Sequence, residues 1–428
     1  MPDPSASPAP DSVNGLLLMG GGARAAYQIG VLEAIADIRR ECAVWGQTNP
    51  FPVIDGTSAG AINGSALACG AHDFDAAVRR MVDVWKNFHV DQVYRADSIG
   101  MLRTGASWLT LMSIGWVLAH WRKLKPRSLL DNAPLLDLLR QLVPLDELPG
   151  LIANGQLHAL GVTASSYSSG EHVTFFEGAD NITAWSRSQR YGIRQRITHQ
   201  HLLASSAIPF VFPARALPVR GRDEYFGDGS MRQSAPVAAA IHLGANRVLV
   251  VGAGRLHEPP ADPATLPPNQ YPTLAQIAGH TLSNIFLDAL TVDVERVKRI
   301  NHTIGLVPSA ARMSSGLRPI DLLVIAPSQR IDAIAAKHID ALPRPVRALL
   351  SGVGVTADKS DFQGAALASY LLFEPEYTRE LIALGRADTM RQRTEVVRFF
   401  GWVDPCPVDP TAGDTPRTER RRDPLRLR

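Results

Sequence analysis

The residues at 56–60 read Gly-Thr-Ser-Ala-Gly, the G-x-S-x-G pattern in which a serine acts as a nucleophile. An apolar stretch, 51–55, precedes this turn, and a helix-forming stretch rich in alanine and glycine follows it as far as Cys69. A serine in a sharp turn between strand and helix has its hydroxyl exposed above the sheet edge. Ser58 is therefore the candidate nucleophile, with a plain tight turn capped by a serine as the alternative. Two glycines support the turn, Gly56 and Gly60.

A second glycine-rich turn covers 20–24 and reads Gly-Gly-Gly-Ala-Arg. It lies between an apolar strand at 15–19 and about 16 residues of helix-forming sequence, so its N–H groups face an anion at the helix start. Such donors can form an oxyanion hole, where removal of one donor costs about 3 to 4 kcal/mol of transition-state stabilisation. The predicted members of the oxyanion hole are Gly20, Gly21, Gly22, Ala23 and Arg24.

A dinucleotide site is the competing interpretation of this glycine-rich turn. It needs a G-x-G-x-x-G spacing and an acidic residue about 20 positions further on. Ala25 occupies the last glycine position, and the next acidic strand end, Asp55, adjoins the serine turn. The spacing thus favours the oxyanion hole. We predict neither a cofactor nor a metal site.

A serine that attacks must lose its proton, so a base within hydrogen-bond reach is required. Asp228 lies in Tyr-Phe-Gly-Asp-Gly-Ser, where a carboxylate ends a strand between two glycines, and Gly229 supports its turn. We predict that Asp228 is the base, with a simple β-turn aspartate as the alternative. Three histidines follow the serine inside helical patterns that favour surface or packing roles: His280, His302 and His338.

These turns require a sheet to position them. A hairpin is predicted from 157–165 and 172–177. Further single strands are predicted at 224–228, 247–253 and 321–326. Helical patterns are predicted at 271–299, 331–350 and 361–400, the last of them broken at Pro375. Strands separated by helices indicate an α/β fold with a mainly parallel sheet covered on both faces, and ligand chemistry at the carboxyl ends of its strands.

Composition restricts the function classes. The chain is 45% apolar and 20% charged, which is ordinary for a globular protein. The net charge of +3 is accounted for by the arginine-rich segment 411–428, so the body carries no basic face for nucleic acid. Three cysteines match no zinc or disulfide pattern, and 1–12 lacks the features of a signal peptide. We therefore expect a cytoplasmic protein.

Residues 105–121 are unusual because the segment has 17 residues without formal charge, three of them tryptophan, before a basic cluster. It is shorter than the roughly 20 apolar residues of a membrane span. The segment 105–127 is a candidate for peripheral membrane contact or an active-site lid, and a buried core helix is the alternative.

The motifs at 20–24 and 56–60, followed by Asp228-Gly229, resemble in their order the patatin-like phospholipase family. The resemblance covers about 13–254 well and extends more loosely to about residue 390. It implies a three-layer α/β/α patatin-like fold with added C-terminal helices. It further implies a Ser-Asp dyad without histidine and calcium-independent hydrolysis of fatty-acyl esters of phospholipids or other lipids. In this resemblance Ser58 carries the acyl group, Asp228 is the general base, and Gly21 and Gly22, helped by Arg24, hold the oxyanion.

Two positions depart from the family pattern, Ala25 and Ser230, where glycine and glycine or alanine are usual. Neither is a reacting group. Two other functions stay open: an acyltransferase or thioesterase that uses the same serine, and a non-catalytic lipid-binding or scaffold protein of the same fold. The oligomeric state is not predicted. The predicted organisation is a disordered segment 1–12, a hydrolase domain 13–330 with its catalytic core at 13–254, a helical region 331–402 and a disordered tail 403–428.

Overall fold

A computed structural model describes residues 12–44, 49–95, 128–256, 274–283, 289–308, 311–312, 317–352, 355 and 362–405. The segment 105–127, the first eleven residues and the tail from 406 lie outside these ranges. At the centre is a ten-stranded sheet in the order β10-β9-β1-β2-β3-β4-β6-β5, to which β8 is added through β3 and β7 through β8. The strands are β1 Asn14–Leu18, β2 Val53–Thr57, β3 Ala159–Ser166, β4 His172–Gly178, β5 Trp185–Arg187, β6 Arg190–Arg194, β7 Arg215–Val219, β8 Arg222–Asp228, β9 Arg247–Val251 and β10 Asp321–Ile325.

The central part of the sheet, from β10 to β3, is parallel. Its inner strands are almost continuous runs of buried apolar residues, as expected where both faces of a sheet are covered. The predicted hairpin is confirmed, because β3 and β4 pair antiparallel. The strands β5, β6 and β7 were not predicted, since their exposed and charged residues give no apolar signal. The predicted strands appear within two residues of their expected ends.

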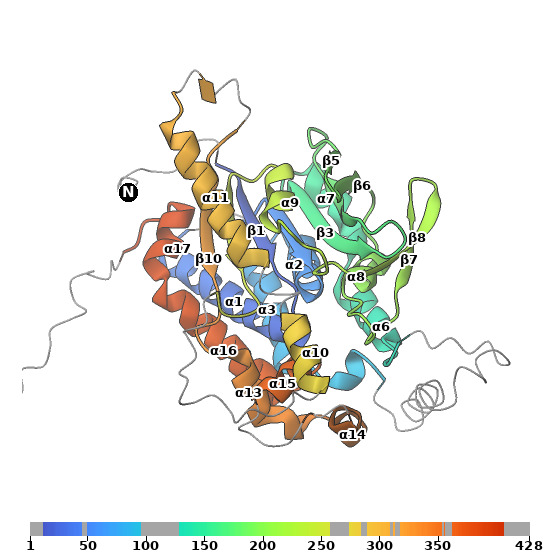
Figure 1. Cartoon of the computed structure of the whole chain (residues 1–428). Coiled ribbons are helices and arrows are strands. Elements are labelled where there is room, and N and C mark those ends of the chain that lie inside the picture. Colours follow the sequence, from blue (N-terminus) through green and yellow to red (C-terminus); the bar gives the residue numbers. More distant parts are fainter. Residues whose placement is uncertain are drawn as a thin grey trace, which may run out of the picture.

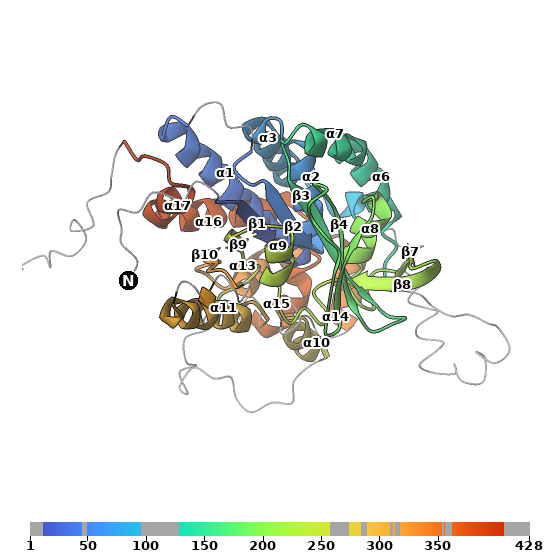
Figure 2. The same cartoon turned by 90° about the horizontal axis from the view of Figure 1, so that it is seen from above.

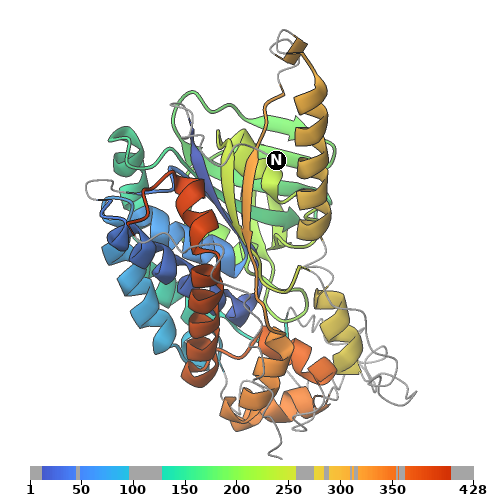
Figure 3. The ribbon, with the colours of Figure 1, turned by 90° about the vertical axis from the view of Figure 1, so that its left-hand side faces the viewer.

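Helices cover both faces of the sheet and form a three-layer α/β/α arrangement (Figures 1 and 2). One face is covered by α1, α2, α3 and α16, and the other by α9 and α11 (Figure 3). The helices of these two layers are α1 Ala26–Glu41, α2 Ala59–Cys69, α3 Phe74–Lys86, α9 Val237–His242, α11 Ala289–Leu306 and α16 Pro375–Arg391. The remaining helices are α6 Ala133–Leu142, α7 Leu148–Ala153, α8 His199–Ser205, α10 Leu274–Ser283, α13 Ile331–His338, α14 Arg344–Gly352, α15 Phe362–Ser369 and α17 Arg393–Phe400.

The helical stretch predicted at 331–350 is two helices, α13 and α14, so the prediction of one element was wrong. Pro343 directly precedes α14, and proline supplies no N–H and disfavours helical backbone in the residue before it. The break predicted at Pro375 is confirmed, because α16 begins there and α15 ends at Ser369.

The C-terminal helix α16 packs tightly on α1. A Cβ atom on Gly30 of α1 would lie 1.9 Å from the carbonyl oxygen of Ile382, and one on Gly385 would lie 2.1 Å from that of Tyr27. The Tyr27 hydroxyl also donates to Asp388, at 3.0 Å. Glycine at both positions therefore allows the two backbones to touch, and α16 belongs to the same layer as α1, α2 and α3.

Candidate active site

Ser58 lies in a strained turn between β2 and α2. Its backbone has φ +57° and ψ −130°, a conformation that residues other than glycine rarely adopt. Residues 56 and 60 on either side of Ser58 are glycines, because a side chain at either position would collide with the backbone. A Cβ on Gly60 would be 2.2 Å from the carbonyl oxygen of Leu18, and one on Gly56 would be 2.5 Å from that of Gly60. The turn therefore rests directly on the end of β1.

The structure brings Ser58 and Asp228 together. The Ser58 hydroxyl donates to Oδ2 of Asp228 at 2.6 Å, and both side chains are buried. Asp228 reaches this place because β8 pairs antiparallel with β3, which in turn lies beside β2. Residues 170 positions apart thus form a hydrogen-bonded serine-carboxylate pair.

Burial dominates the electrostatics of Asp228. Removal of its carboxylate from water raises its pKa to about 6, although hydrogen bonds from Ser58 and from the N–H of Ser230, the latter at 2.9 Å, favour the charged form. The pKa of the nearby His172 is lowered to about 4 by burial, so its neutral ring donates from Nε2 to the carbonyl oxygen of Gly229 at 2.9 Å. This hydrogen bond from His172 stabilises the turn that carries Asp228. The histidines 280, 302 and 338 lie on the helices α10, α11 and α13, and α11 extends past the end predicted at 299.

Ser205, at the end of α8, is hydrogen-bonded both to the Ser58 turn and to the residue after Asp228. Its hydroxyl accepts from the N–H of Ser58 at 2.8 Å and donates to the carbonyl oxygen of Thr163 at 2.6 Å. Its own carbonyl oxygen accepts from Gly229 at 3.1 Å. No role was predicted for Ser205 from the sequence; the signal that could have found it is the run of small residues Ala204-Ser205-Ser206-Ala207 before Ile208-Pro209.

The glycine-rich turn forms a short 3-10 helix, Gly22–Ala25, at the end of β1. Two of its five predicted donors are already engaged: the N–H of Ala23 donates to Tyr370 at 3.0 Å and that of Arg24 to Gly21 at 3.1 Å. This reduces the number of N–H groups that can serve as the predicted oxyanion donors. In the described part of the chain, the N–H groups of Gly20, Gly21 and Gly22 have no such partner. The N–H of Ala59, the first of helix α2, is a further donor by position.

The Arg24 side chain is buried and is held by the C-terminal helices. Its Nε donates to Oγ of Ser369 at 2.8 Å, and its Nη2 forms an ion pair with Asp332. The guanidinium carbon lies 4.0 Å from the centre of the Tyr370 ring. Because these contacts occupy the guanidinium, the help of Arg24 to an oxyanion stays a prediction, and it would act through the position of the turn.

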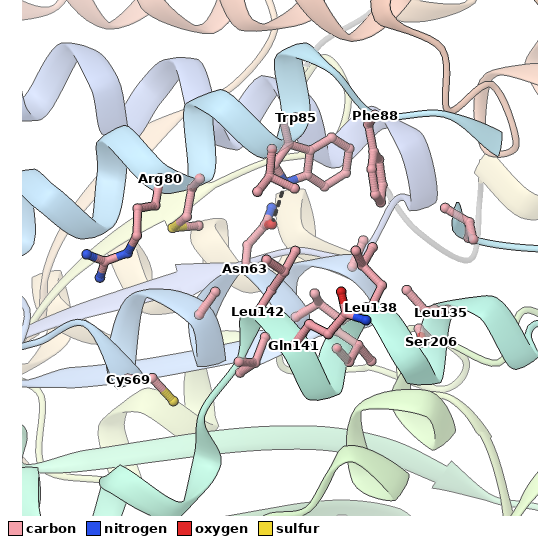
Figure 4. A pocket seen from close by; sticks show the side chains of 18 of the residues that line it. Asn63, Cys69, Arg80, Trp85, Phe88, Leu135, Leu138, Gln141, Leu142 and Ser206 are labelled. Carbon is pink, nitrogen blue, oxygen red and sulfur yellow. Dashed lines mark hydrogen bonds between the residues drawn. The ribbon is translucent and has the colours of Figure 1, made fainter. Parts of the chain in front are cut away.

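A cavity of about 460 Å³ begins at Ser58 and Gly22 and runs along α2, between α3 and α6 (Figure 4). Its middle is lined by apolar side chains, among them Ile62, Ala66, Met81, Val84, Leu135, Leu138 and Leu139. Phe373, which follows α15, also contributes to the wall. The site is thus a buried serine-carboxylate pair at one end of an elongated apolar cavity.

The family model described as patatin-like phospholipase matches residues 16–241, slightly more than half of the chain. The chain belongs to the patatin-like phospholipase family. The match spans both turns and Asp228 and ends within α9. Membership in the patatin-like family confirms the recognised resemblance and the three-layer fold, and it supports hydrolysis of lipid acyl esters as the general activity.

The chain is also similar to solved bacterial structures. For VipD from Legionella pneumophila the identity is 13% and the TM-score 0.27, with 88% of this chain and 67% of VipD covered. For the type III effector protein ExoU the identity is 16% and the TM-score 0.27, with 85% and 78% covered. A complex of ExoU with SpcU, from the type III secretion system of Pseudomonas aeruginosa, gives 15% identity and a TM-score of 0.25, with 84% and 76% covered. Among curated protein sequences no match is found.

Within the described ranges, no helix is both long and apolar enough to cross a bilayer. The same ranges contain no group of three or more His, Cys, Asp or Glu side chains placed to bind a metal ion.

Proposed function

We propose that this patatin-like protein hydrolyses fatty-acyl esters of phospholipids or lysophospholipids through an acyl-enzyme on Ser58, with Asp228 as the base. The observation that carries the proposal is the 2.6 Å hydrogen bond from the strained, buried serine to the carboxylate. A nucleophile needs a base at this distance, and the pKa of Asp228, about 6, leaves it ionised at neutral pH.

In the proposed reaction, Asp228 takes the hydroxyl proton as Oγ of Ser58 attacks the ester carbonyl. The N–H groups of Gly21, Gly22 and Ala59 stabilise the oxyanion. Asp228 returns its proton to the leaving alcohol, which leaves an acyl group on Ser58. Water then gives a proton to Asp228 and attacks the acyl carbon. The fatty acid departs, and Ser58 regains its proton from Asp228.

The cavity supports a lipid substrate. Its middle is apolar, and it begins at the serine that would carry the acyl group. Binding a hydrocarbon chain there removes apolar surface from water, which contributes about 0.8 kcal/mol for each buried methylene. A small polar ester would gain little from such a cavity.

The C-terminal helical region predicted at 331–402 is proposed as part of the working hydrolase. Tyr370 holds the N–H of Ala23, and Phe373 lines the cavity. The tight contact of α16 with α1 supports the same proposal. On this basis 13–330 and 331–402 act as one catalytic unit.

Fluorophosphonate labelling tests the proposed function. Wild type should be modified at Ser58, as located by mass spectrometry, and Ser58→Ala should not be modified. Asp228→Asn should react much more slowly. The control Ser186→Ala changes an exposed serine on β5 and should label like wild type. Hydrolysis of lysophospholipid should persist in a calcium chelator.

Two outcomes would overturn the proposal. A folded wild type that binds lipid vesicles but neither labels nor hydrolyses esters would indicate a binding protein. Preferential transfer of the acyl group to added alcohols instead of water would indicate an acyltransferase.

A further inference from the structure

The cavity beside α2 is elongated and has two chemically different ends. One end is formed by Ser58, Gly22 and Ser206, and the other by Cys69 and Arg80. Figure 4 shows Ser206, Leu135 and Phe88 toward one side of the cavity and Cys69 and Arg80 toward the other. A chain attached to Ser58 has one elongated apolar space to follow, which runs along α2.

The buried amide of Asn63 in the cavity wall is hydrogen-bonded within the protein. Its Oδ1 accepts from Nε1 of Trp85 at 3.0 Å (Figure 4). Its Nδ2 donates to Oε1 of Gln28 at 2.9 Å and to the carbonyl oxygen of Ala25 at 3.3 Å. Gln28 donates in turn to the carbonyl oxygen of Met19 at 2.6 Å, just before the glycine-rich turn. Both N–H groups of Asn63 are therefore engaged and its oxygen already accepts one bond, so the other side chains make the middle of the cavity mainly apolar.

The far end is a polar rim that faces solvent. Four exposed side chains line it: His72, Arg80, Gln141 and Glu147. Gly70 packs against Ala77, and the guanidinium of Arg80 lies close to Gly70. In the part of the chain that the structure describes, this end of the cavity borders on solvent, because all four polar side chains are exposed. A hydrocarbon chain that extends past Cys69 would therefore meet water and charged groups.

The length of α2 sets the scale of the apolar part. Its 11 residues extend about 16 Å at a rise of about 1.5 Å per residue. An extended hydrocarbon chain advances about 1.3 Å per carbon, given C–C bonds of about 1.5 Å. About twelve carbons therefore reach from Ser58 to the rim.

We propose that this cavity selects acyl esters by chain length, with the first twelve or so carbons buried along α2 and any longer chain emerging between Arg80 and Gln141. The proposal rests on the proposed function of Ser58. Because the far end is open, longer chains are tolerated, but their additional methylenes gain no burial. Ala66, about two turns along α2 from Ser58, sets the accessible length at the middle of the cavity.

A chain-length series measures this directly. With monomeric substrates of roughly four to eighteen carbons, kcat/KM should rise about three- to fourfold per methylene and become flat beyond about twelve. Ala66→Phe should move the break to about eight or nine carbons, because it blocks the cavity there. The control Ala387→Phe adds the same ring on the exposed face of α16 and should keep the wild-type profile. An unchanged break in Ala66→Phe would overturn the proposal.

Photo-crosslinking locates the chain end. Alkyl fluorophosphonates with a terminal diazirine would be attached to Ser58 and irradiated, and the crosslinked peptides mapped by mass spectrometry. A chain of about twelve carbons should crosslink near Cys69, Arg80 or Gln141, and one of about four near Ile62 or Phe88. Absence of phosphonylation at Ser58 contradicts the proposed function. Phosphonylation with crosslinks outside the cavity contradicts only the chain-length proposal.

Discussion

The two turns of the active site are held in different ways. The Ser58 turn is fixed by neighbours inside the family match: Ser205 holds its N–H, Asp228 its hydroxyl, and the end of β1 touches Gly60. The glycine-rich turn is fixed by residues more than 300 positions away, because Tyr370 holds Ala23 while Asp332 and Ser369 hold Arg24.

The residues proposed to react and the residues that position the glycine-rich turn therefore lie in different parts of the chain. The proposed reacting pair, Ser58 and Asp228, lies within 16–241, whereas the turn proposed to bind the oxyanion depends on helices outside that match. Changes at the Ser58 turn should abolish the reaction. Changes at the glycine-rich turn should lower its rate while Ser58 remains reactive. The predictions that follow test this division.

The largest effect is expected at the dyad. Ser58→Ala should lower hydrolysis by about 10⁴-fold or more, and Asp228→Asn by about 10²- to 10⁴-fold, since each removes a reacting group. Steady-state hydrolysis of a soluble ester measures both. Circular dichroism should show folded protein in each case. Activity of Asp228→Asn within threefold of wild type would mean that another group is the base.

The sequence was enough to predict that Ser58 and Asp228 act together, but not which residues hold the glycine-rich turn. Ser58 and Asp228 each stand in a short motif at a strand end, and the resemblance to the patatin-like family paired them. Tyr370 acts through its backbone carbonyl, which any residue type supplies, so its role leaves no mark in the sequence. Ser205 acts through a small hydroxyl, and serine is too common for one such residue to stand out. The engagement of Ala23 and Arg24 was missed for this reason. The strand β5 was missed because an exposed edge strand has no apolar pattern.

Gly22→Ala tests the distant support next. Gly22 has φ +55°, and a Cβ there would lie 2.3 Å from the carbonyl oxygen of Tyr370. The turn or Tyr370 must move, so kcat should fall about 10²- to 10³-fold, as for loss of one oxyanion donor. Gly155→Ala is the matched control, with φ +70° and open space around the added carbon. It should cost about 1 kcal/mol of stability in chemical denaturation and leave kcat unchanged.

The pH dependence of kcat/KM should also distinguish the role of the Ser58 turn from that of the glycine-rich turn. The pKa of Asp228, about 6, exceeds its ordinary value of 3.8 because the carboxylate is buried. Only the ionised form accepts the serine proton, so kcat/KM should fall about tenfold per pH unit below about pH 6 and be level above it. Gly22→Ala should lower the level part without moving the pKa. A shift of one pH unit in that variant would show that the glycine-rich turn also tunes the base.

The smallest effect is expected from the Arg24 contacts. Arg24→Met keeps most of the apolar stem but removes the guanidinium that binds Asp332 and Ser369. The turn retains the Ala23 to Tyr370 hydrogen bond, so kcat should fall only about three- to tenfold, with little change in KM. The exposed pair Arg347 and Asp340 is the control, and Arg347→Met should have no measurable effect on kcat.

A double-mutant cycle decides whether Arg24 acts through its partner. If it does, Asp332→Asn should lower kcat by a similar factor, and the double variant Arg24→Met with Asp332→Asn should be no slower than the worse single variant. Fully multiplicative losses would mean that the two residues act independently. A wild-type kcat in Arg24→Met, accompanied by a lower Tm, would restrict the ion pair to stabilising the fold. In that case the Ala23 to Tyr370 hydrogen bond and the fit around Gly22 would be sufficient to position the turn.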